Sequence, residues 1–351
     1  MVFTKQVEIR LPRDMIAGHD ALPQVVHLCE VLGLSGDALI VTGKTTRKIA
    51  GDRVALLLQA GGYGCHLLER TSATQRDVTA VERAARSAKA RFIFGVGGGS
   101  RIDLGKMAAT NLGIPFISVP TSVAHDGIVS PRASISDGRC SISKGVRPPV
   151  GVLADTGIIA QAPHRLWAAG CGDAIANLTA VADWRLARRL RNESFSSSAA
   201  ALSEMAGQLV VDHANEIRPS DEASAWLVLK SLLYSGISMA IANSSRPASG
   251  AEHKFSHALD RIAPGKALHG EQCGVGAIMM ARLHGMDWEA IREVLRTVGS
   301  PINAKGLGVE EGAVIEALMA MREIRPERYT IGCDLDRGEA ERLARVTGVV
   351  G

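Results

Sequence analysis

The densest group of side chains able to do chemistry lies between positions 250 and 271. Residues 250–260 read Gly-Ala-Glu-His-Lys-Phe-Ser-His-Ala-Leu-Asp and residues 268–271 read Leu-His-Gly-Glu, which places three of the ten histidines close together. His253 and His257 are four apart, so on a helix both rings would leave one face, one turn apart. A metal ion can use that spacing, although paired histidines on a helix are as often bonded to neighbours. His269 could return to the same point after the turn at Pro264-Gly265.

Asp173 is the carboxylate that would complete such a site. It follows Gly170-Cys-Gly, where the first long helix of the second half is expected to open, and by itself it would serve as an N-cap or a first-turn acid. Asp173, His253 and His269 would give one oxygen and two nitrogens around a divalent metal, and three protein ligands with an open position is the catalytic zinc pattern. The spacing equally allows Asp173, His253 and His257.

Residues 94–103, Phe-Gly-Val-Gly-Gly-Gly-Ser-Arg-Ile-Asp, join an apolar strand to a helix. Three glycines let the backbone approach a ligand closely, and the free N–H groups of the first helical turn suit a pyrophosphate. Ser100 and Asp103 also have the spacing of a capping box. The segment is not a G-x-G-x-x-G motif, and a plain capped turn is the alternative. The strand–turn–helix context favours nucleotide binding.

A second loop, residues 118–131, reads Ser-Val-Pro-Thr-Ser-Val-Ala-His-Asp-Gly-Ile-Val-Ser-Pro and follows the next strand. Its small hydroxyl residues at the carboxyl end of a strand could bind phosphate or ribose. Asp126 could accept hydrogen bonds from substrate hydroxyls. A loop of this composition can also be purely structural.

The surrounding pattern predicts two domains, an α/β half over residues 1–162 and an all-α half over residues 163–351. Strands expected in the first half alternate with helices, which indicates a Rossmann-like parallel sheet with right-handed crossovers. Ligands of such sheets bind at the carboxyl ends of the strands, so the helical half would close a cleft over that edge. The expected strands are 7–10, 38–42, 65–68, 92–96, 115–119 and 150–154, with a hairpin over 133–143 that turns at Asp137-Gly138. The expected helices of the second half are 172–191, 197–214, 223–242, 251–262, 274–283, 288–298, 310–321 and 337–345.

Composition narrows the class of protein. A net charge of +4 without a basic run gives no support for nucleic-acid binding. Six cysteines without C-x-x-C or framework spacing indicate reduced thiols in the cytoplasm. The first residues lack the apolar core of a signal peptide. The most apolar stretch, 226–242, contains Lys230 and is expected to be a buried helix rather than a membrane span.

Four segments, 96–106, 115–131, 169–173 and 249–271, resemble in order the archaeal-type sn-glycerol-1-phosphate dehydrogenases. That family belongs to the superfamily of dehydroquinate synthase, glycerol dehydrogenase and metal-dependent alcohol dehydrogenases. The Gly-Gly-Gly-Ser…Asp…Lys and His-x-x-x-His…His-Gly-Glu elements mark the superfamily, and the Ala-His-Asp-Gly-Ile-x-Ser-Pro block is more specific. The resemblance covers nearly the whole chain and implies a dehydroquinate synthase-like fold.

The resemblance implies reduction of dihydroxyacetone phosphate to sn-glycerol 1-phosphate, the backbone step of archaeal ether-lipid and hence phospholipid synthesis, by a homo-oligomer with NADPH or NADH. One Zn²⁺ per subunit, on Asp173, His253 and His269, would polarise the C2 carbonyl for hydride attack. Asp126, Asp173 and His257 would bind substrate, with Asp173 and His257 catalytic. The cofactor would contact Gly98, Gly99, Ser100, Arg101, Ile102, Asp103, Thr121, Ser122, Val123, Ala124 and Ser130.

Some residue roles, and the function itself, allow alternatives. Arg101 stands where the family usually has an apolar residue, and it could face solvent or the cofactor phosphates. Lys44 is a candidate for the 2′-phosphate of NADPH. A dehydrogenase of unphosphorylated polyols is the nearest alternative function, followed by a sugar-phosphate cyclase and a non-catalytic metal-binding module. Candidate cations for the substrate phosphate are Lys144, Arg147, Lys254 and Lys266.

Overall fold

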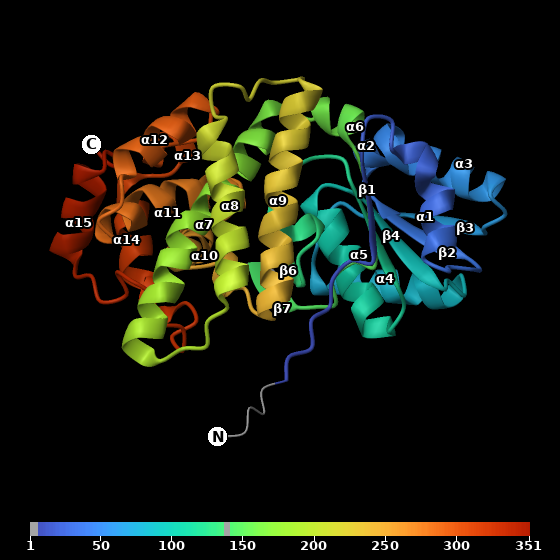
Figure 1. The fold of residues 1–351 in the computed structure, drawn as a ribbon, viewed down its shortest axis with the longest axis horizontal. Coiled ribbons are helices and arrows are strands. Elements are labelled where there is room, and N and C mark those ends of the chain that lie inside the picture. Colours follow the sequence, from blue (N-terminus) through green and yellow to red (C-terminus); the bar gives the residue numbers. More distant parts are fainter. Residues whose placement is uncertain (1–5, 137–140) are drawn as a thin grey trace.

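The computed structural model describes residues 6–136 and 141–351, with a parallel sheet in the first half and helices in the second (Figure 1). The sheet has six strands in the order β1-β8-β5-β4-β2-β3, and every pairing is parallel. Its strands are β1 (Asp14–Gly18), β2 (Ala38–Thr42), β3 (Cys65–Glu69), β4 (Phe92–Gly97), β5 (Phe116–Pro120) and β8 (Gly151–Asp155).

One strand prediction was wrong. Residues 7–10 are not in a strand, and the first strand is β1, four residues further on. Val7 and Ile9 are 55% and 48% exposed, so their alternation with polar residues does not reflect a buried face. β1 instead pairs with β8, placing Asp14 opposite Gly151 at the edge of the sheet.

Helices cover both faces of the sheet, as strand–helix alternation requires. Successive residues of a strand point to opposite faces, so Ile40 and Phe94 pack with α1 and α3 while Leu39 and Ile93 pack with α4 and α5. The elements of this half are η1 (Leu22–Gln24), α1 (Val25–Val31), α2 (Lys44–Thr46), the π-helical turn η2 (Arg47–Gly51), α3 (Asp52–Ala60), α4 (Gln75–Ser87), α5 (Gly99–Leu112), η3 (Asp126–Ile128) and α6 (Thr156–Ala160).

A separate two-stranded hairpin follows η3. Strands β6 (Arg132–Ser136) and β7 (Ser141–Gly145) pair antiparallel, with Ala133 opposite Lys144. The predicted turn at Asp137-Gly138 lies outside the described residues. The hairpin packs against α5 and carries residues that line the cavity described below.

Beyond His164 the described chain forms a helical body beside the sheet (Figure 1). Its longest helix, α7, begins eight residues before the predicted start at residue 172. The elements are α7 (His164–Arg191), α8 (Ser197–Asp212), α9 (Glu222–Ala242), η4 (Arg246–Ala248), α10 (Ala251–Ile262), α11 (His269–Leu283), α12 (Trp288–Thr297), α13 (Ala304–Leu307), α14 (Glu311–Ala320), η5 (Met321–Glu323) and α15 (Arg337–Val346).

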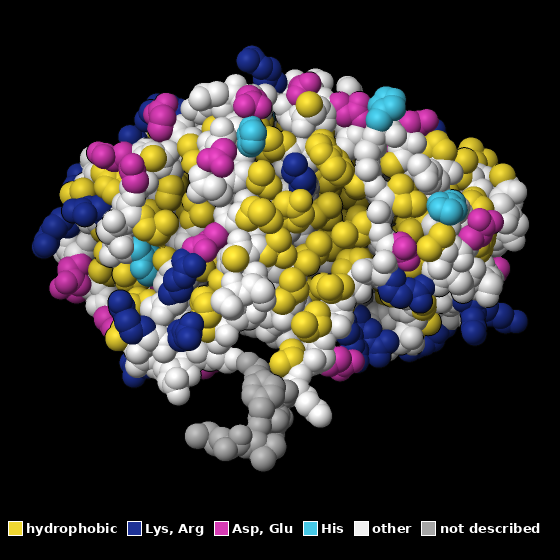
Figure 2. Space-filling model, in the orientation of Figure 1, with side chains coloured by type: hydrophobic (Ala, Val, Ile, Leu, Met, Phe, Trp, Pro, Cys, Tyr) yellow, Lys and Arg dark blue, Asp and Glu magenta, His cyan; other side chains and the backbone are white. Residues whose placement is uncertain are grey.

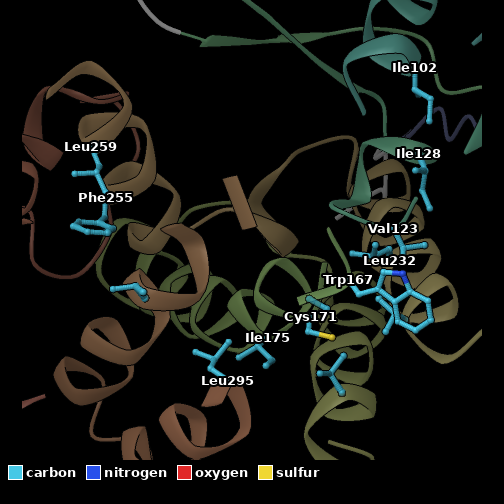
Figure 3. Close-up of a cluster of buried hydrophobic side chains, with 14 of the residues drawn as sticks. Ile102, Val123, Ile128, Trp167, Cys171, Ile175, Leu232, Phe255, Leu259 and Leu295 are labelled. Atoms are coloured by element: carbon cyan, nitrogen blue, oxygen red, sulfur yellow. The ribbon is translucent and has the colours of Figure 1, made fainter. Parts of the chain in front are cut away.

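One apolar core runs from one half of the chain into the other. Figure 3 shows it passing from Ile102 and Val123 beside the sheet, through Trp167 and Cys171 on α7, to Phe255 on α10. All five side chains are fully buried. The edge of the sheet where α5 begins is therefore held against α7, which carries Asp173.

Among the described residues, α9 alone has the length and apolar composition of a membrane span. However, 61% of its most apolar window is buried inside the protein, as expected of a core helix. Trp226 on α9 is 40% exposed. Figure 2 shows hydrophobic side chains gathered near the middle of this side of the molecule, over α9.

Candidate active site

Three helices bring the predicted metal-binding side chains to one point. Asp173 lies on α7, His253 in the first turn of α10, and His269 at the start of α11. The Nε2 atoms of His253 and His269 lie 3.9 and 3.7 Å from Asp173 Oδ1. Ligand atoms about 2.0–2.1 Å from a tetrahedral ion lie roughly 3.4 Å apart, so these spacings are close to those of a bound metal.

Glycines explain why these helices approach so closely. A Cβ at Gly172 would lie 2.3 Å from the carbonyl oxygen of Gly270, and one at Gly270 would lie 1.9 Å from that of Ala169. Any larger residue would push α7 and α11 apart. Gly172 thus packs inside α7 and does not open it, and Asp173 is a mid-helix residue rather than the expected N-cap.

Both imidazoles are held from behind by a second partner. His253 Nδ1 lies 2.9 Å from Oε1 of Glu252, and His269 Nδ1 lies 3.1 Å from Oγ of Ser256. Partners on the far nitrogen fix the tautomer and leave Nε2 free for a metal, as in many zinc sites. The structure thus directs both Nε2 atoms toward Asp173.

The electrostatics fit a cation at this point. Asp173 Oδ1 is buried without a hydrogen-bond partner among the described residues. Burial, and next the charge of Asp173, raise the pKa of Asp126 to about 7. Burial and the adjacent His253 hold the pKa of His269 well below its usual value, which favours the neutral form that binds metals. A divalent ion would satisfy the free carboxylate oxygen and both acids.

A groove of about 880 Å³ lies beside the cluster at the carboxyl ends of the strands. Gly98, the N-cap of α5, lines it with Thr121 and Ser122 from the loop after β5. A Cβ at Gly99 would lie 1.7 Å from His125 Nε2, so the turn passes tightly between groove and cavity. An open helix N-terminus at this edge is a suitable place for a dinucleotide pyrophosphate.

The sequence of the chain is similar to those of named enzymes. The chain is 52% identical over 343 residues to glycerol-1-phosphate dehydrogenase (NAD(P)+) of Methanosarcina barkeri, covering 97% of this chain and 96% of the relative. The enzyme of the same name from Methanoculleus marisnigri is 49% identical over 345 residues, covering 98% and 94%. The chain belongs to the glycerol-1-phosphate dehydrogenase family.

The fold of this family member is shared more widely. A family model described as iron-containing alcohol dehydrogenase matches residues 16–163. A probable glycerol dehydrogenase from Sinorhizobium meliloti 1021 superimposes with a TM-score of 0.80 at 18% identity, covering 98% of this chain and 99% of that one. Sulfoacetaldehyde reductase from Bifidobacterium kashiwanohense, solved with NAD+, gives 0.79 at 15%, covering 99% and 100%. These similarities confirm the predicted dehydroquinate synthase-like fold.

A cavity beside the cluster contains the two other predicted substrate residues. Asp126 and His257 both line a cavity of about 140 Å³ next to the cluster. The ring centroid of His257 lies 5.9 Å from that of His269, and His257 is not in the group of four potential ligands that lie within 4.8 Å of one another. Burial, followed by the charges of His253 and Arg325, lowers the pKa of His257 to about 3.

The fourth member of that group is Cys273, which sequence analysis missed. Its Sγ lies 3.6 Å from Nε2 of His269, one turn earlier on α11. The i, i+4 spacing from His269 was the available signal. Burial raises the pKa of its thiol to about 11, so it is protonated at neutral pH.

The predicted cofactor residues of the dehydrogenase separate into three groups. Gly98, Thr121 and Ser122 line the groove. Asp103 and Ser130 instead line the cavity, and Asp103 accepts from Ser134 N at 2.9 Å, so the predicted capping box with Ser100 does not form. The third group lines neither the groove nor the cavity and consists of Gly99 and exposed Ser100 in the first turn of α5, buried Ile102 and Val123, half-buried Ala124, and Arg101. The cofactor roles of all three groups stay predictions.

Arg101 does not extend into solvent. Its guanidinium donates to the backbone carbonyls of Arg70 and Thr71, in the loop after β3. Burial lowers the pKa of Arg101. The side chain also lies close to the glycine turn, because a Cβ at Gly97 would be 2.8 Å from Cγ of Arg101. It joins two loops at the edge of the sheet.

The cations proposed from sequence for a substrate phosphate do not line the cavity. Lys254 is buried and donates to the carbonyl oxygen of Arg328 at 2.6 Å, and Lys144 donates to Gln75 at 3.2 Å. Lys266 is exposed, and Arg147 lines a neighbouring cavity. The cavity instead contains Arg132, the first residue of β6, and Arg325, in the loop after η5. The sequence did not indicate them, because isolated arginines carry no periodic signal.

Proposed function

We propose that this chain reduces the C2 carbonyl of dihydroxyacetone phosphate to sn-glycerol 1-phosphate, using NADPH or NADH and a divalent metal. Relatives at about this length and at 49% and 52% identity are named for this product and for NAD(P)+. The observation that carries the proposal is the convergence of Asp173, His253 and His269 beside the glycine turn.

We infer that Asp173 Oδ1 and the Nε2 atoms of His253 and His269 would hold one zinc ion, because this donor set is typical of catalytic zinc. A catalytic site keeps one position open, so we place Cys273 in the wall and not among the ligands. When bound, the ion would supply Lewis-acid polarisation of the carbonyl, and the reduced nicotinamide would supply the hydride.

The remaining chemistry is that of the chain's own side chains. The backbone N–H of Asp126 donates to Asp173 Oδ2 at 2.9 Å, and Ser235 Oγ donates to Asp126 Oδ2 at 2.7 Å. These bonds fix Asp126 where its carboxylate can orient a substrate hydroxyl. His257 lies on the same cavity wall, and its imidazole can accept a proton at one nitrogen while donating from the other, so it can pass a proton to the C2 oxygen.

We place the nicotinamide nucleotide along the groove, with its pyrophosphate at the N-terminus of α5. Gly98, Thr121 and Ser122 support this placement because they line the groove, Gly98 at the N-terminus of α5 and the other two with hydroxyl groups. Lys44, at the exposed start of α2 after the carboxyl end of β2, is our candidate for the 2′-phosphate of NADPH. The route served would be ether-lipid synthesis.

The decisive experiment is an NADPH-oxidation assay with dihydroxyacetone phosphate, before and after treatment with dipicolinate, with chiral analysis of the product. We expect turnover that is lost on chelation and restored by Zn²⁺, giving sn-glycerol 1-phosphate. Asp173→Asn should lose both zinc and activity. Absence of NADPH oxidation, or a product of the opposite hand, would refute the proposal.

The alternatives give different results in the same assay. A polyol dehydrogenase would oxidise glycerol with NAD+ and gain nothing from the phosphate ester. A sugar-phosphate cyclase would cause no net NADPH oxidation, and a metal-binding module would bind zinc without turnover. We favour the first reading over these because of the relatives' names.

We also propose a homo-oligomer located in the cytoplasm. The apolar outer face of α9, where Trp226 is 40% exposed, supports self-association because isolated proteins rarely expose large apolar areas. Sedimentation of the purified protein would test it, and a monomer at assay concentration would contradict it.

A further inference from the structure

The side chains that line the cavity beside the metal-binding cluster are of two chemical kinds. Carboxylates and imidazoles, among them His253 and His269 of the cluster, form one set. The other set consists of two guanidinium groups and of small hydroxyl side chains from the hairpin and from the segment before α10. These residues are Arg132, Arg325, Ser134, Ser143, Ser245 and Ser249.

We propose that Arg132 and Arg325 together bind the phosphate group of the substrate and make the enzyme selective for phosphorylated trioses. This inference rests on the proposed function, since it assigns the second end of the same substrate. Two guanidiniums can neutralise a phosphate dianion and bind its oxygens through paired N–H groups.

Arg132 is oriented by the hairpin. Its Nε donates to Ser143 Oγ at 3.1 Å and its Nη2 to the Ser143 carbonyl oxygen at 2.8 Å, across the β6–β7 pairing. Its own carbonyl oxygen accepts from the fully buried Lys106 Nζ at 2.6 Å. The side chain is therefore held against the cavity by two strands and one buried cation.

Arg325 reaches the cavity from the loop after η5. Its φ of 47° lies in the left-handed region, which residues with a Cβ seldom adopt and which is concentrated at functional sites. Its Nη1 lies 3.5 Å from Ser245 Oγ, a hydroxyl that also accepts from Arg328 Nη2 at 3.1 Å. Positive charge thus gathers around one serine.

Carboxylates lie near the two guanidiniums without pairing with them: Asp103 lines the same cavity and accepts from Ser134 N at 2.9 Å, and the charge of Glu327 acts on Arg325. In the described part of the chain, the hydrogen bonds of these two guanidiniums go to serine oxygens and not to carboxylates. Burial, and next the charge of Arg325, lower the pKa of Arg132. Burial and Arg325 also lower the pKa of Arg328 to about 10. Two partly buried guanidiniums that hold no carboxylate partner form an environment that favours binding a phosphate.

The test compares two substrates that differ only in the phosphate, dihydroxyacetone phosphate and dihydroxyacetone. Steady-state NADPH oxidation is measured for the zinc-loaded wild type, Arg132→Gln and Arg325→Gln. Arg147→Gln is the matched control, because Arg147 lines a neighbouring cavity together with Arg132 but not the substrate cavity. Calorimetry with inorganic phosphate on the NADP+-loaded proteins provides a second readout.

Each glutamine variant should raise KM for the phosphate ester by about 10- to 100-fold, the usual cost of losing a charged hydrogen bond. Activity on dihydroxyacetone and the Arg147→Gln control should not change, and phosphate binding should weaken in both variants. Arg132→Lys and Arg325→Lys should restore part of the loss, because they keep the charge without the planar fork.

Two results would overturn the assignment: an unchanged KM in both glutamine variants, or equal losses on both substrates, which would mean a structural role. If the wild type does not reduce dihydroxyacetone phosphate at all, the proposed function fails separately. The phosphate calorimetry then decides the subsite by itself, with weakened binding supporting it and unchanged binding refuting it.

Discussion

Glu252 allows a test of how a neighbouring side chain orients His253 in the proposed metal site. It is completely buried, and its Oε1 lies 2.9 Å from His253 Nδ1 and 2.6 Å from the Gly250 N–H that donates to it. Thr179 Oγ1 donates to its other oxygen at 2.8 Å. Burial alone would raise the pKa of Glu252, but its bonds and the charge of His253 outweigh burial and lower it, so the group is ionised at neutral pH.

Glu252→Gln keeps the size of the side chain but removes its charge. The amide oxygen can still accept from one or two neighbours, yet the imidazole of His253 loses the carboxylate that fixes its tautomer. Loss of such a partner usually lowers metal affinity 10- to 100-fold, or about 1.4–2.7 kcal/mol of binding free energy. We therefore expect weaker zinc binding with a retained fold.

Competition with a chromophoric chelator measures the zinc affinity, and circular dichroism verifies the fold. Asp155→Asn is the matched control, because Asp155 is also buried and accepts a backbone hydrogen bond, from Leu22 N at 3.0 Å. Asp155 is not part of the cluster. Equal zinc affinity in wild type and Glu252→Gln, or an equal loss in both variants, would show that Glu252 does not position His253.

Three further predictions concern stability and cofactor choice. Gly170→Ala should destabilise the fold by about 1–3 kcal/mol in urea unfolding, because its Cβ would lie 1.9 Å from the Val123 carbonyl oxygen, whereas Gly312→Ala meets nothing within 4 Å and should be neutral or stabilising. Asp77 is the N3 residue of the capping box of α4, whose N-cap is Thr74, and hydrogen bonds from Ser72 and Thr74 outweigh burial and lower the pKa of Asp77. The stabilisation from ionised Asp77 is therefore present above the pKa of the unfolded state and is lost as pH falls through the lower pKa of the folded state. Asp77→Asn should lower the free energy of unfolding by about 1 kcal/mol at pH 7 and should have no effect at a pH below both pKa values. Lys44→Ala should raise KM for NADPH about tenfold or more without changing KM for NADH, and an unchanged ratio of the two would remove Lys44 from the cofactor site.

The sheet was largely predictable because its strands are buried on both faces and bounded by glycine. Ala38–Thr42 and Phe92–Gly97 are fully buried and contain a single polar residue, Thr42, so their composition alone identifies them. β1 was missed because an edge strand is only partly buried and contains Asp14. Residues 7–10 were wrongly preferred because their alternation mimics a half-buried strand.

The sequence predicted the proposed metal ligands only as two alternative sets. Spacing on α10 allowed either His257 or His269 to join Asp173 and His253, since periodicity describes one helix and not the path of the next. The choice depends on the direction in which α11 leaves the turn after α10. In the structure His269 Nε2 comes 3.7 Å from Asp173, and His257 stays on the cavity wall.

The glycines of α7 show why the position of Asp173 in its helix could not be predicted from the local sequence. Gly170 and Gly172 resemble a helix boundary in sequence, because glycine is a poor helix former. In the fold they are the points where α7 touches the Val123 carbonyl and α11. Their local cost allows two helices to approach until Asp173 and His269 share one point. The same residues that obscured the start of α7 are thus the ones that position Asp173, and a prediction from propensity alone places Asp173 in the first turn of the helix.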